Sequence, residues 1–383
     1  MKILLVGEYS RLHNSLKEGL THLGHDVVIV STGDSFKNFA TDYSIAARFF
    51  ERSWFLKKTA GALLKVTGIN LFLTEKGLRF YNLLPKLKGF DHIQLINSDA
   101  LETHPTLAKR LYKKLLQHNN SSLSLLICGD ETPIIDYYLT GKLKYSVLTP
   151  YLKDNSLKSY FSYPLKYINK PYRNLFEWIK ANAICLITSD LDYEVPMKAM
   201  GHNTIFIPNP INSAVISFIP PVVGNKVIIF LGINRMSYIK KGITYFEDAL
   251  AEIAKKYPDT VEVIVTENIP YAKYITLYNS AHIVLDQVYA YDQGYNALEA
   301  MAKGKVVFTG AETEFTQYYN LTQKVAINAL PDVDALVADL SFLIENPQEI
   351  VAIGTRARSF IEKEHNYIEV AKKYLEAWRL SNS

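Results

Sequence analysis

Cysteine is scarce in this chain of 383 residues: it occurs twice, as Cys128 and Cys185, each inside an apolar run. Such a pair suits small buried side chains in a reducing compartment and excludes a disulfide framework or a thiolate metal site. The 18 glycines and 15 prolines are scattered, which excludes collagen-like and low-complexity chains. With 48% hydrophobic and 21% charged residues, the composition is that of a globular protein.

Long apolar runs are also absent. Lysine or arginine interrupts every apolar window before it reaches the roughly 18 residues that a membrane-spanning helix needs. The first residues, 1–7, are apolar over too short a stretch to form the centre of a signal peptide. We therefore expect a cytoplasmic protein.

Positive charge is concentrated in one region, although the net charge of the whole chain is only +4. Residues 45–90 contain nine lysines and arginines against two glutamates, a local net charge of +7, interleaved with aromatic residues such as Trp54 and Phe55. Residues 151–172 extend this character. The region suits contact with an anionic membrane, at the inner face of the plasma membrane, and equally suits helices packed on a sheet with a solvated basic face. Nucleic acid is disfavoured as a partner because the net charge is small and no known module is present.

Apolar runs alternate with helix-compatible segments over residues 1–207. Strands are predicted at residues 3–6, 27–30, 93–96, 123–128, 183–188 and 204–207, and helices at 13–23, 106–117 and 173–180. This alternation favours βαβ units and therefore a parallel sheet. We predict one Rossmann-like domain over residues 1–207.

The prolines at 208, 210, 220 and 221 bracket a stretch without periodicity, as in a hinge between domains. The alternation then restarts, with strands predicted at 226–231, 261–265, 283–286, 305–308 and 324–327, and helices at 244–256, 295–303 and 333–344. We predict a second Rossmann-like domain over residues 208–365 and a terminal helix within 366–383. The expected fold class is α/β, with two Rossmann-like domains facing across a cleft.

Ligands of open parallel sheets bind beyond the carboxyl ends of the strands, and two segments at such places stand out. In the first, residues 294–307, a loop leads into a helix whose first turn is followed by Glu299. This carboxylate can accept hydrogen bonds from a ribose diol, while the open N–H groups of the helix start can meet phosphate oxygens. The alternative is that Glu299 only complements the helix dipole.

The second segment runs from Phe230 to Arg235 and on to Lys240-Lys241-Gly242. Arg235 and Lys241 flank a loop between a strand and a helix, where two cations can clamp a diphosphate. The alternative is an exposed basic turn.

The segments 232–242 and 294–307, in this order and about sixty residues apart, resemble the carboxyl-terminal domain of retaining GT-B glycosyltransferases of family 4. Asn209 is similar to the asparagine of the family's Asn-Gly segment at the domain junction, with Pro210 replacing the glycine. Residues 23–27 resemble the family's first helix-to-strand turn. The resemblance implies an acceptor domain at 1–207, a nucleotide-sugar donor domain at 208–365, and a final helix, within 366–383, that packs back toward the first domain.

The resemblance also implies roles for individual residues. Arg235 and Lys241 would be the catalytic residues, because they would bind the donor diphosphate and stabilise charge on the departing nucleotide, and Glu299 would hold the ribose hydroxyls. Further donor-binding residues would be Gly7, Asn209, Gly232, Gly294, Tyr295 and Asn296. Fixed cations make a metal unnecessary, so no metal or other cofactor is expected beside the nucleotide sugar; Asp190-Leu191-Asp192 is the nearest acidic pair.

Two departures from the family pattern concern the sugar. Tyr291 stands where many members have a first glutamate, so Asp286 or Asp292 is the candidate substitute. The first domain lacks the histidine that relatives place near the reacting sugar. Its candidate sugar or acceptor contacts are instead Asn97, Asp99, Asp130 and Glu131, with structural capping as the alternative role.

The resulting hypothesis is a retaining, metal-independent glycosyltransferase of the hexosyltransferase type, which moves a sugar from a nucleotide-diphosphate donor to a glycan or lipid-linked acceptor in surface polysaccharide or glycoconjugate synthesis. The alternatives are a non-catalytic sugar-nucleotide-binding partner protein and a GT-B nucleotide-sugar epimerase. Transfer needs an acceptor, epimerisation does not, and a binding protein does neither.

Overall fold

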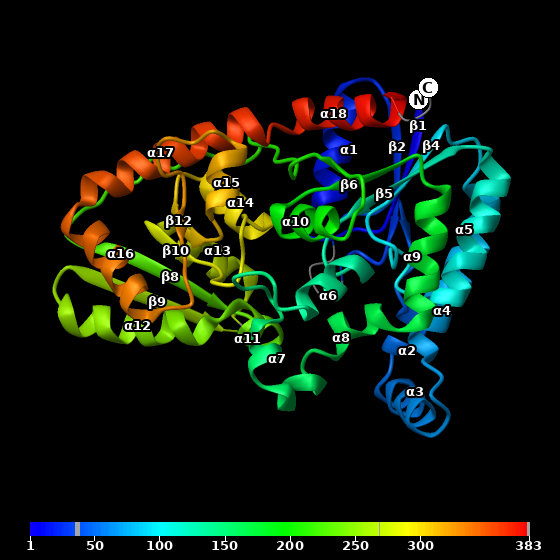
Figure 1. The fold of residues 1–383 in the computed structure, drawn as a ribbon, viewed down its shortest axis with the longest axis horizontal. Helices are drawn as coiled ribbons and strands as arrows, with labels where there is room; N and C mark the ends of the chain where they lie inside the picture. The colour runs from blue at the N-terminus through cyan, green and yellow to red at the C-terminus, as the bar shows by residue number, and fades with distance from the viewer. Residues whose placement is uncertain (35–38, 268, 381–383) are drawn as a thin grey trace.

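The computed structural model describes residues 1–34, 39–267 and 269–380. Two parallel β-sheets, each flanked by helices, lie at opposite ends of an elongated molecule (Figure 1). The α/β fold class predicted from the alternating pattern is confirmed.

The first sheet has seven strands in the order β3-β2-β1-β4-β5-β6-β7, all parallel. Its strands are β1 (Lys2–Val6), β2 (Asp26–Ser31), β3 (Tyr43–Ser44), β4 (His92–Leu95), β5 (Ser122–Ile127), β6 (Cys185–Thr188) and β7 (Ile205–Phe206). Residues 3–6 of β1 are completely buried, because helices cover both faces of the sheet. That double coverage explains why this strand is apolar at every position rather than at every second one.

Ten α-helices accompany this sheet within the described part of residues 1–207. They are α1 (Leu12–His22), α2 (Arg48–Glu51), α3 (Trp54–Thr67), α4 (Leu71–Leu83), α5 (Pro105–Asn119), α6 (Thr132–Leu139), α7 (Thr149–Lys153), α8 (Ser162–Leu165), α9 (Lys170–Asn182) and α10 (Leu191–Ala199). Helices α6, α7, α8 and α10 lie toward the second sheet, whereas α2 and α3 lie at the end of the molecule away from it (Figure 1).

The second sheet has five parallel strands in the order β12-β11-β10-β8-β9. Its strands are β8 (Val227–Ile233), β9 (Val261–Glu267), β10 (Ile283–Leu285), β11 (Val306–Thr309) and β12 (Ile327–Asn328), and its helices are α11 (Tyr238–Lys241), α12 (Ile243–Lys256), α13 (Tyr271–Ser280), α14 (Tyr295–Ala302), α15 (Thr313–Tyr318), α16 (Val333–Glu345) and α17 (Pro347–Glu364).

Two predicted strands need correction. Residues 324–327 were expected to pair, but only Ile327 and Asn328 do, opposite Phe308 and Thr309. The strand expected at 226–231 extends to Ile233, because Gly232 and Ile233 continue the ladder with β9. Gly232 therefore lies inside a strand rather than in the loop after it.

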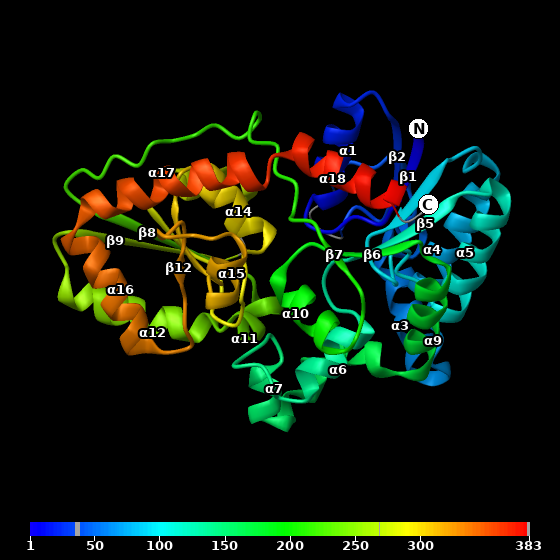
Figure 2. The same cartoon turned by 45° about the horizontal axis from the view of Figure 1, so that its top comes forward.

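The last helix, α18 (Tyr367–Leu380), returns to the first sheet and packs along α1 (Figure 2). A Cβ atom on Gly19 of α1 would lie 2.2 Å from the carbonyl oxygen of Tyr367, so only glycine allows this approach. Trp378 is buried and stacks on His92 with ring centroids 4.1 Å apart. The end of the chain thus belongs to the core of the first sheet.

Candidate functional site

The carboxyl ends of neighbouring strands in the second sheet bring several polar side chains to one edge. Arg235 follows β8, Glu267 ends β9, Asp286 follows β10 and Thr309 ends β11. Because all strands are parallel, these ends share the edge where ligands of such sheets bind.

Arg235 lies at the surface of this edge. Its Nε and Nη2 atoms donate to the two carboxylate oxygens of Glu267 over 2.9 and 2.7 Å, and its guanidinium lies over the ring of Tyr238. The side chain is 55% exposed, so water screens this ion pair and the pair contributes little to stability. A ligand phosphate can therefore compete for the guanidinium at small cost.

Lys241 is held more firmly. Its Nζ lies 2.7 Å from Oδ1 of the buried Asp286. The same oxygen accepts from Asn296 Nδ2 at 3.2 Å, and Oδ2 of Asp286 accepts from Thr309 Oγ1 at 3.3 Å. Gly242 follows with φ +66°, and a Cβ atom there would lie 2.3 Å from Val288. The glycine thus lets α11 end and α12 begin while Lys241 stays against Asp286.

Helix α14 supplies the predicted ribose carboxylate and a contact to the first domain. Gly294 precedes its first turn, and the hydroxyl of Tyr295 donates to the carbonyl oxygen of Pro210 at 2.9 Å and also contacts Ser15 of α1. Burial opposes the charge of Arg11, but Glu18, whose carboxylate oxygen lies 2.8 Å from Nη2, and to a smaller extent Tyr295 and Glu299 outweigh it and raise the pKa of this guanidinium. Arg11 of the first domain therefore lies close enough to Glu299 for the two charges to interact.

The two aspartates proposed to replace the missing glutamate have different surroundings. Asp286 forms the ion pair with Lys241 that is described above. Asp292 is buried at the junction of the domains, where it accepts from the backbone N–H of Leu191 at 3.2 Å and its own N–H donates to Asp192 at 3.2 Å. Burial raises the pKa of Asp292 to about 7, and the structure turns this side chain toward the junction.

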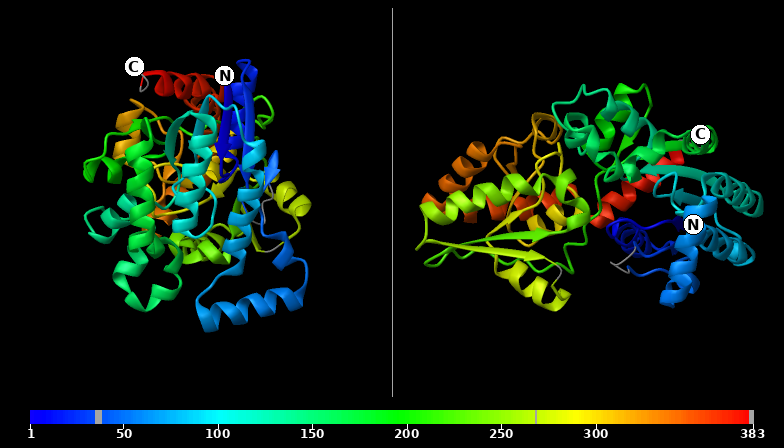
Figure 3. Two further views of the ribbon diagram at one scale, coloured as in Figure 1. Left: turned by 90° about the vertical axis from the view of Figure 1, so that its right-hand side faces the viewer. Right: turned by 90° about the horizontal axis from the view of Figure 1, so that it is seen from below.

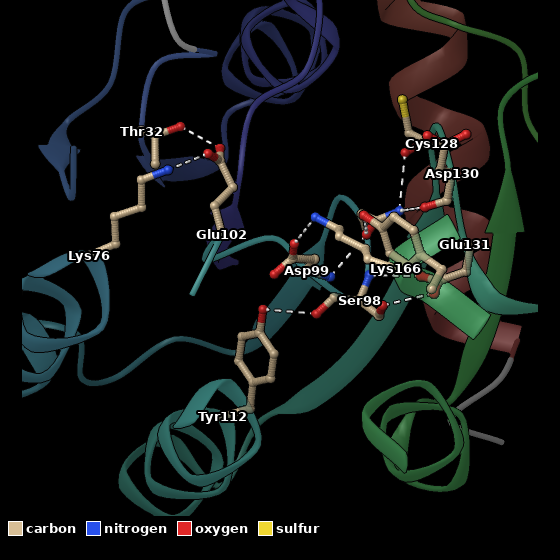
Figure 4. Close-up of polar contacts among 12 residues, drawn as sticks. Thr32, Lys76, Ser98, Asp99, Glu102, Tyr112, Cys128, Asp130, Glu131 and Lys166 are labelled. Atoms are coloured by element: carbon tan, nitrogen blue, oxygen red, sulfur yellow. Dashed lines mark hydrogen bonds and ion pairs between the residues drawn. The ribbon is translucent and has the colours of Figure 1, made fainter. Parts of the chain in front are cut away.

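Two of the predicted acceptor contacts in the first domain, Glu131 and Asn97, form internal hydrogen bonds; Figure 4 shows those of Glu131 with Ser98. Glu131 is completely buried, caps α6, and accepts from the backbone N–H and hydroxyl of Ser98 at 2.9 and 2.8 Å. Burial raises its pKa to about 7. Asn97 donates to the carbonyl oxygens of Cys128 and Asp130 and so holds the loop after β5. These geometries match the structural alternative of the sequence analysis.

Asp99 and Asp130 have less complete sets of partners. Asp99 is buried, and its Oδ2 lies 2.8 Å from Nζ of Lys166, whereas its Oδ1 has no hydrogen-bond partner among the described residues. The ammonium of Lys166 also lies 3.7 Å from the ring centroid of Tyr163. Burial raises the pKa of Asp130, and the charge of Lys240 from the second domain opposes that rise. The segment of residues 235–241 in the second domain and the strand ends of the first sheet thus face each other.

The remaining predicted donor contacts lie at close backbone approaches. Gly7 has φ +87°, and a Cβ atom there would lie 2.4 Å from Ile96, so packing alone requires this glycine. Gly232 packs under Tyr274, and the buried Asn209 accepts at its carbonyl oxygen from the ring of His365 at 2.8 Å. Within residues 1–34, 39–267 and 269–380, no three histidine, cysteine or acidic side chains gather as metal ligands.

Sequence reasoning missed two side chains at this cleft, Arg11 and Lys166. Ser10 and Arg11 both have positive φ, at 52° and 73°, which strains the loop after β1. Lys166 lay within a segment noted only for its basic and aromatic character. Neither residue carries a motif; the structure shows that Lys166 pairs with Asp99 and Arg11 with Glu18, both within the first domain.

Comparisons with known proteins bear on the second domain and on the overall fold. Residues 242–376 match the model of a family described as glycosyl transferase-like. Sucrose-phosphate synthase from Thermosynechococcus elongatus has a similar structure, with a TM-score of 0.63, 15% identity and 99% of both chains covered. The resemblance to GT-B glycosyltransferases is confirmed.

Other GT-B structures extend the similarity. HepE from Anabaena in complex with UDP and glucose has a TM-score of 0.57, 12% identity and both chains fully covered. A UDP-GlcNAc 2-epimerase from Neisseria meningitidis bound to UDP-GlcNAc has a TM-score of 0.52 and 14% identity, with 98% of this chain and 99% of that one covered. No curated protein sequence matches the chain. At these identities the structural similarity concerns the fold.

Proposed function

We propose that this GT-B protein is a retaining, metal-independent hexosyltransferase that moves a sugar from a nucleotide-diphosphate donor to a glycan or lipid-linked acceptor of a surface polysaccharide or glycoconjugate. The observation that carries the proposal is the placement of Arg235 and Lys241 at the ligand-binding edge of the second sheet, directly before the segment that matches the glycosyl transferase-like family.

The reaction would proceed through charge stabilisation. Breaking the bond between the sugar and the diphosphate leaves negative charge on the β-phosphate, and cations fixed near it lower the barrier. Asp286 fixes Lys241 in place, and the side chain of Lys241 keeps 30% of its surface exposed for a phosphate. Arg235 would exchange Glu267 for the diphosphate. The β-phosphate would then accept the proton of the acceptor hydroxyl on the same face of the sugar, which retains the anomeric configuration.

The first domain would bind the acceptor. Asp99 has one carboxylate oxygen without a partner among the described residues, and Lys240 approaches Asp130 across the cleft. Glu299 would hold the ribose hydroxyls of the donor, with Arg11 beside it. Contacts between the domains, such as that of Tyr295 with Ser15, would exclude water from the closed cleft.

The first test is thermal stabilisation by a panel of nucleoside diphosphates and their sugars, with Arg235→Ala and Glu299→Ala as variants and Lys255→Ala on the exposed side of α12 as the control. A nucleotide supplied at roughly 100 times its Kd stabilises the folded state by about 2.7 kcal/mol. We expect a shift with one nucleotide in the wild type and the control, and no shift in either site variant. No shift with any nucleotide would refute the donor site.

Turnover then separates the three functions. A transferase consumes the donor fully only with an acceptor, keeps its activity in EDTA, and gives a product whose anomeric configuration matches the donor in an NMR spectrum. An epimerase converts the donor without an acceptor, and the epimerase of the same fold makes that control necessary. A partner protein binds the nucleotide without turnover.

A further inference from the structure

Helix α3 stands away from the body of the first domain (Figure 3, left, the blue helix at the bottom). Of its residues only Ala60 is buried. Trp54, Phe55 and Val66 are exposed by 72, 67 and 85%. Large apolar side chains that gather at a surface in this way mark a site of contact with a partner.

The exposed face of α3 combines apolar and basic side chains. Phe55, Ala62 and Val66 follow at spacings of seven and four residues and so lie along one stripe of the helix. Lys58 and Lys65 lie beside this stripe, and Nζ of Lys58 is 4.8 Å from the ring centroid of Trp54. A helix with an aromatic stripe and flanking lysines suits the boundary between lipid headgroups and acyl chains.

A basic groove of about 420 Å³ lies between α5 and α9. Four cations line it: Lys109, Arg110, Lys113 and Lys170. Both helices begin at the groove, at Pro105 and Lys170, so the positive ends of two helix dipoles add to its field. No acidic residue lines the groove within the described parts of the chain.

The groove and α3 belong to one continuous surface. Thr103, just before α5, donates to the carbonyl oxygen of Leu73 at 2.6 Å, and the ring of His104 lies 3.3 Å from the carbonyl oxygen of Asn70. Asn70 caps α4 and follows the end of α3 by three residues, with the exposed Ile69 between them. The first turn of α5 therefore lies next to the carboxyl end of α3.

Acidic residues offset little of the charge of this surface. Of the two glutamates in residues 45–90, only Glu51 of α2 is exposed; Glu75 is turned inward, where the backbone N–H groups of Phe49 and Phe50 and the side chain of Arg79 hold it. Two copies of such a surface would repel each other, whereas an anionic surface complements it.

We propose that α3 and the groove between α5 and α9 form a docking face for an anionic lipid bilayer. The apolar stripe of α3 enters the headgroup region, and the cations of α3 and of the groove meet lipid phosphates. The protein lies on the membrane, since no helix in the described chain is long and apolar enough to cross one. This face is separate from the donor site and does not depend on the chemistry proposed there.

The test is flotation of the full chain with phosphatidylcholine vesicles that contain or lack phosphatidylglycerol. The wild type is expected to float with the anionic vesicles and to be released by high salt. Phe55→Ser with Val66→Ser, and Lys109→Glu with Arg110→Glu, are each expected to lower the partition coefficient about tenfold. The matched controls, Phe342→Ser on α16 and Lys226→Glu with Lys255→Glu, change an exposed apolar and a basic surface elsewhere and should float as the wild type does.

Circular dichroism and the midpoint of thermal unfolding check that the variants are folded. A blue shift of tryptophan fluorescence on anionic vesicles, absent in Trp54→Phe, places α3 in the lipid. Failure of the wild type to float, or flotation of both paired variants at the wild-type level, overturns the proposal. The proposal is also overturned if the wild type does not bind vesicles and light scattering shows a dimer that the serine variant converts to a monomer. In that case α3 would bind a second copy of the chain.

Discussion

Charged side chains at the strand ends of the two sheets differ in their exposure to solvent. In the first sheet the carboxylate of Glu131 is completely buried and used up by hydrogen bonds to Ser98 and its own helix. In the second, Arg235 and Lys241 keep exposed surface although each has a carboxylate partner. The same topological position therefore serves as framework in one domain and leaves charged side chains partly exposed in the other.

The comparison also shows why the two domains need each other. Lys240 of the second domain influences the pKa of Asp130 in the first, and the hydroxyl of Tyr160 in the first domain donates to the carbonyl oxygen of Met236 after β8 at 3.0 Å. The segment that follows β8 therefore lies against the first domain. A nucleotide sugar bound between them would meet cations from both domains.

The largest expected effect comes from removing the anchored cation. We expect Lys241→Ala to lower kcat by about a thousandfold, because the departing β-phosphate loses a fixed positive charge and Asp286 then adds an uncompensated negative one. Steady-state kinetics with the donor found by the thermal panel measure this loss.

The double variant Lys241→Ala with Asp286→Asn separates the two causes. It should recover the thermal stability that the single variant loses, since no buried carboxylate is left unpaired, but not the activity. Activity near the wild-type level in the single variant would mean that Lys241 does not touch the donor.

The framework side of the comparison predicts a loss of stability instead. Glu131→Ala removes a buried carboxylate and leaves the N–H groups of Ser98 and Thr132 without their acceptor. We expect a loss of about 2–3 kcal/mol in the free energy of unfolding in urea. Glu131→Gln should lose less, and nucleotide binding should persist in both. Abolished binding in a folded Glu131→Gln variant would instead give this residue a role toward the ligand.

How much of this contrast the sequence could predict differs between fold and site. The apolar runs predicted the strands because buried parallel strands are apolar throughout, and the helix expected at 333–344 is α16 to within one residue. The roles of polar residues at strand ends are harder to predict, since nothing in the sequence tells whether Asn97 or Glu131 points into the cleft or into the protein. The approach of Arg11 to Glu299 depends on how two domains pack, which leaves no local signal.

The junction between the domains is predicted to be pH-dependent. Burial raises the pKa of Asp292 from its usual 3.8 to about 7, so between these values the folded state holds a proton that the unfolded state has lost. Stability from this group is present below pH 4 and falls as the pH rises toward 7, by roughly 1–2 kcal/mol after allowance for relaxation. Asp292→Asn should therefore flatten the fall of the unfolding midpoint between pH 4 and pH 7. An equally steep fall in the variant would assign the slope to other buried acids.

The smallest expected effect tests the link between the two regions. Tyr295 begins α14 of the second domain; its hydroxyl donates to the carbonyl oxygen of Pro210 at the start of that domain and also contacts Ser15 of the first domain. Tyr295→Phe keeps the ring and removes only these bonds, so we expect a loss of about 1 kcal/mol in stability. Because the contact with Ser15 joins the domains, KM for the donor should rise with the loss of closure, whereas Tyr257→Phe after α12, whose hydroxyl donates to Glu345 of the second domain, should leave KM unchanged. If both variants raise KM equally, the hydroxyl of Tyr295 acts through its own domain, and the cleft closes without it.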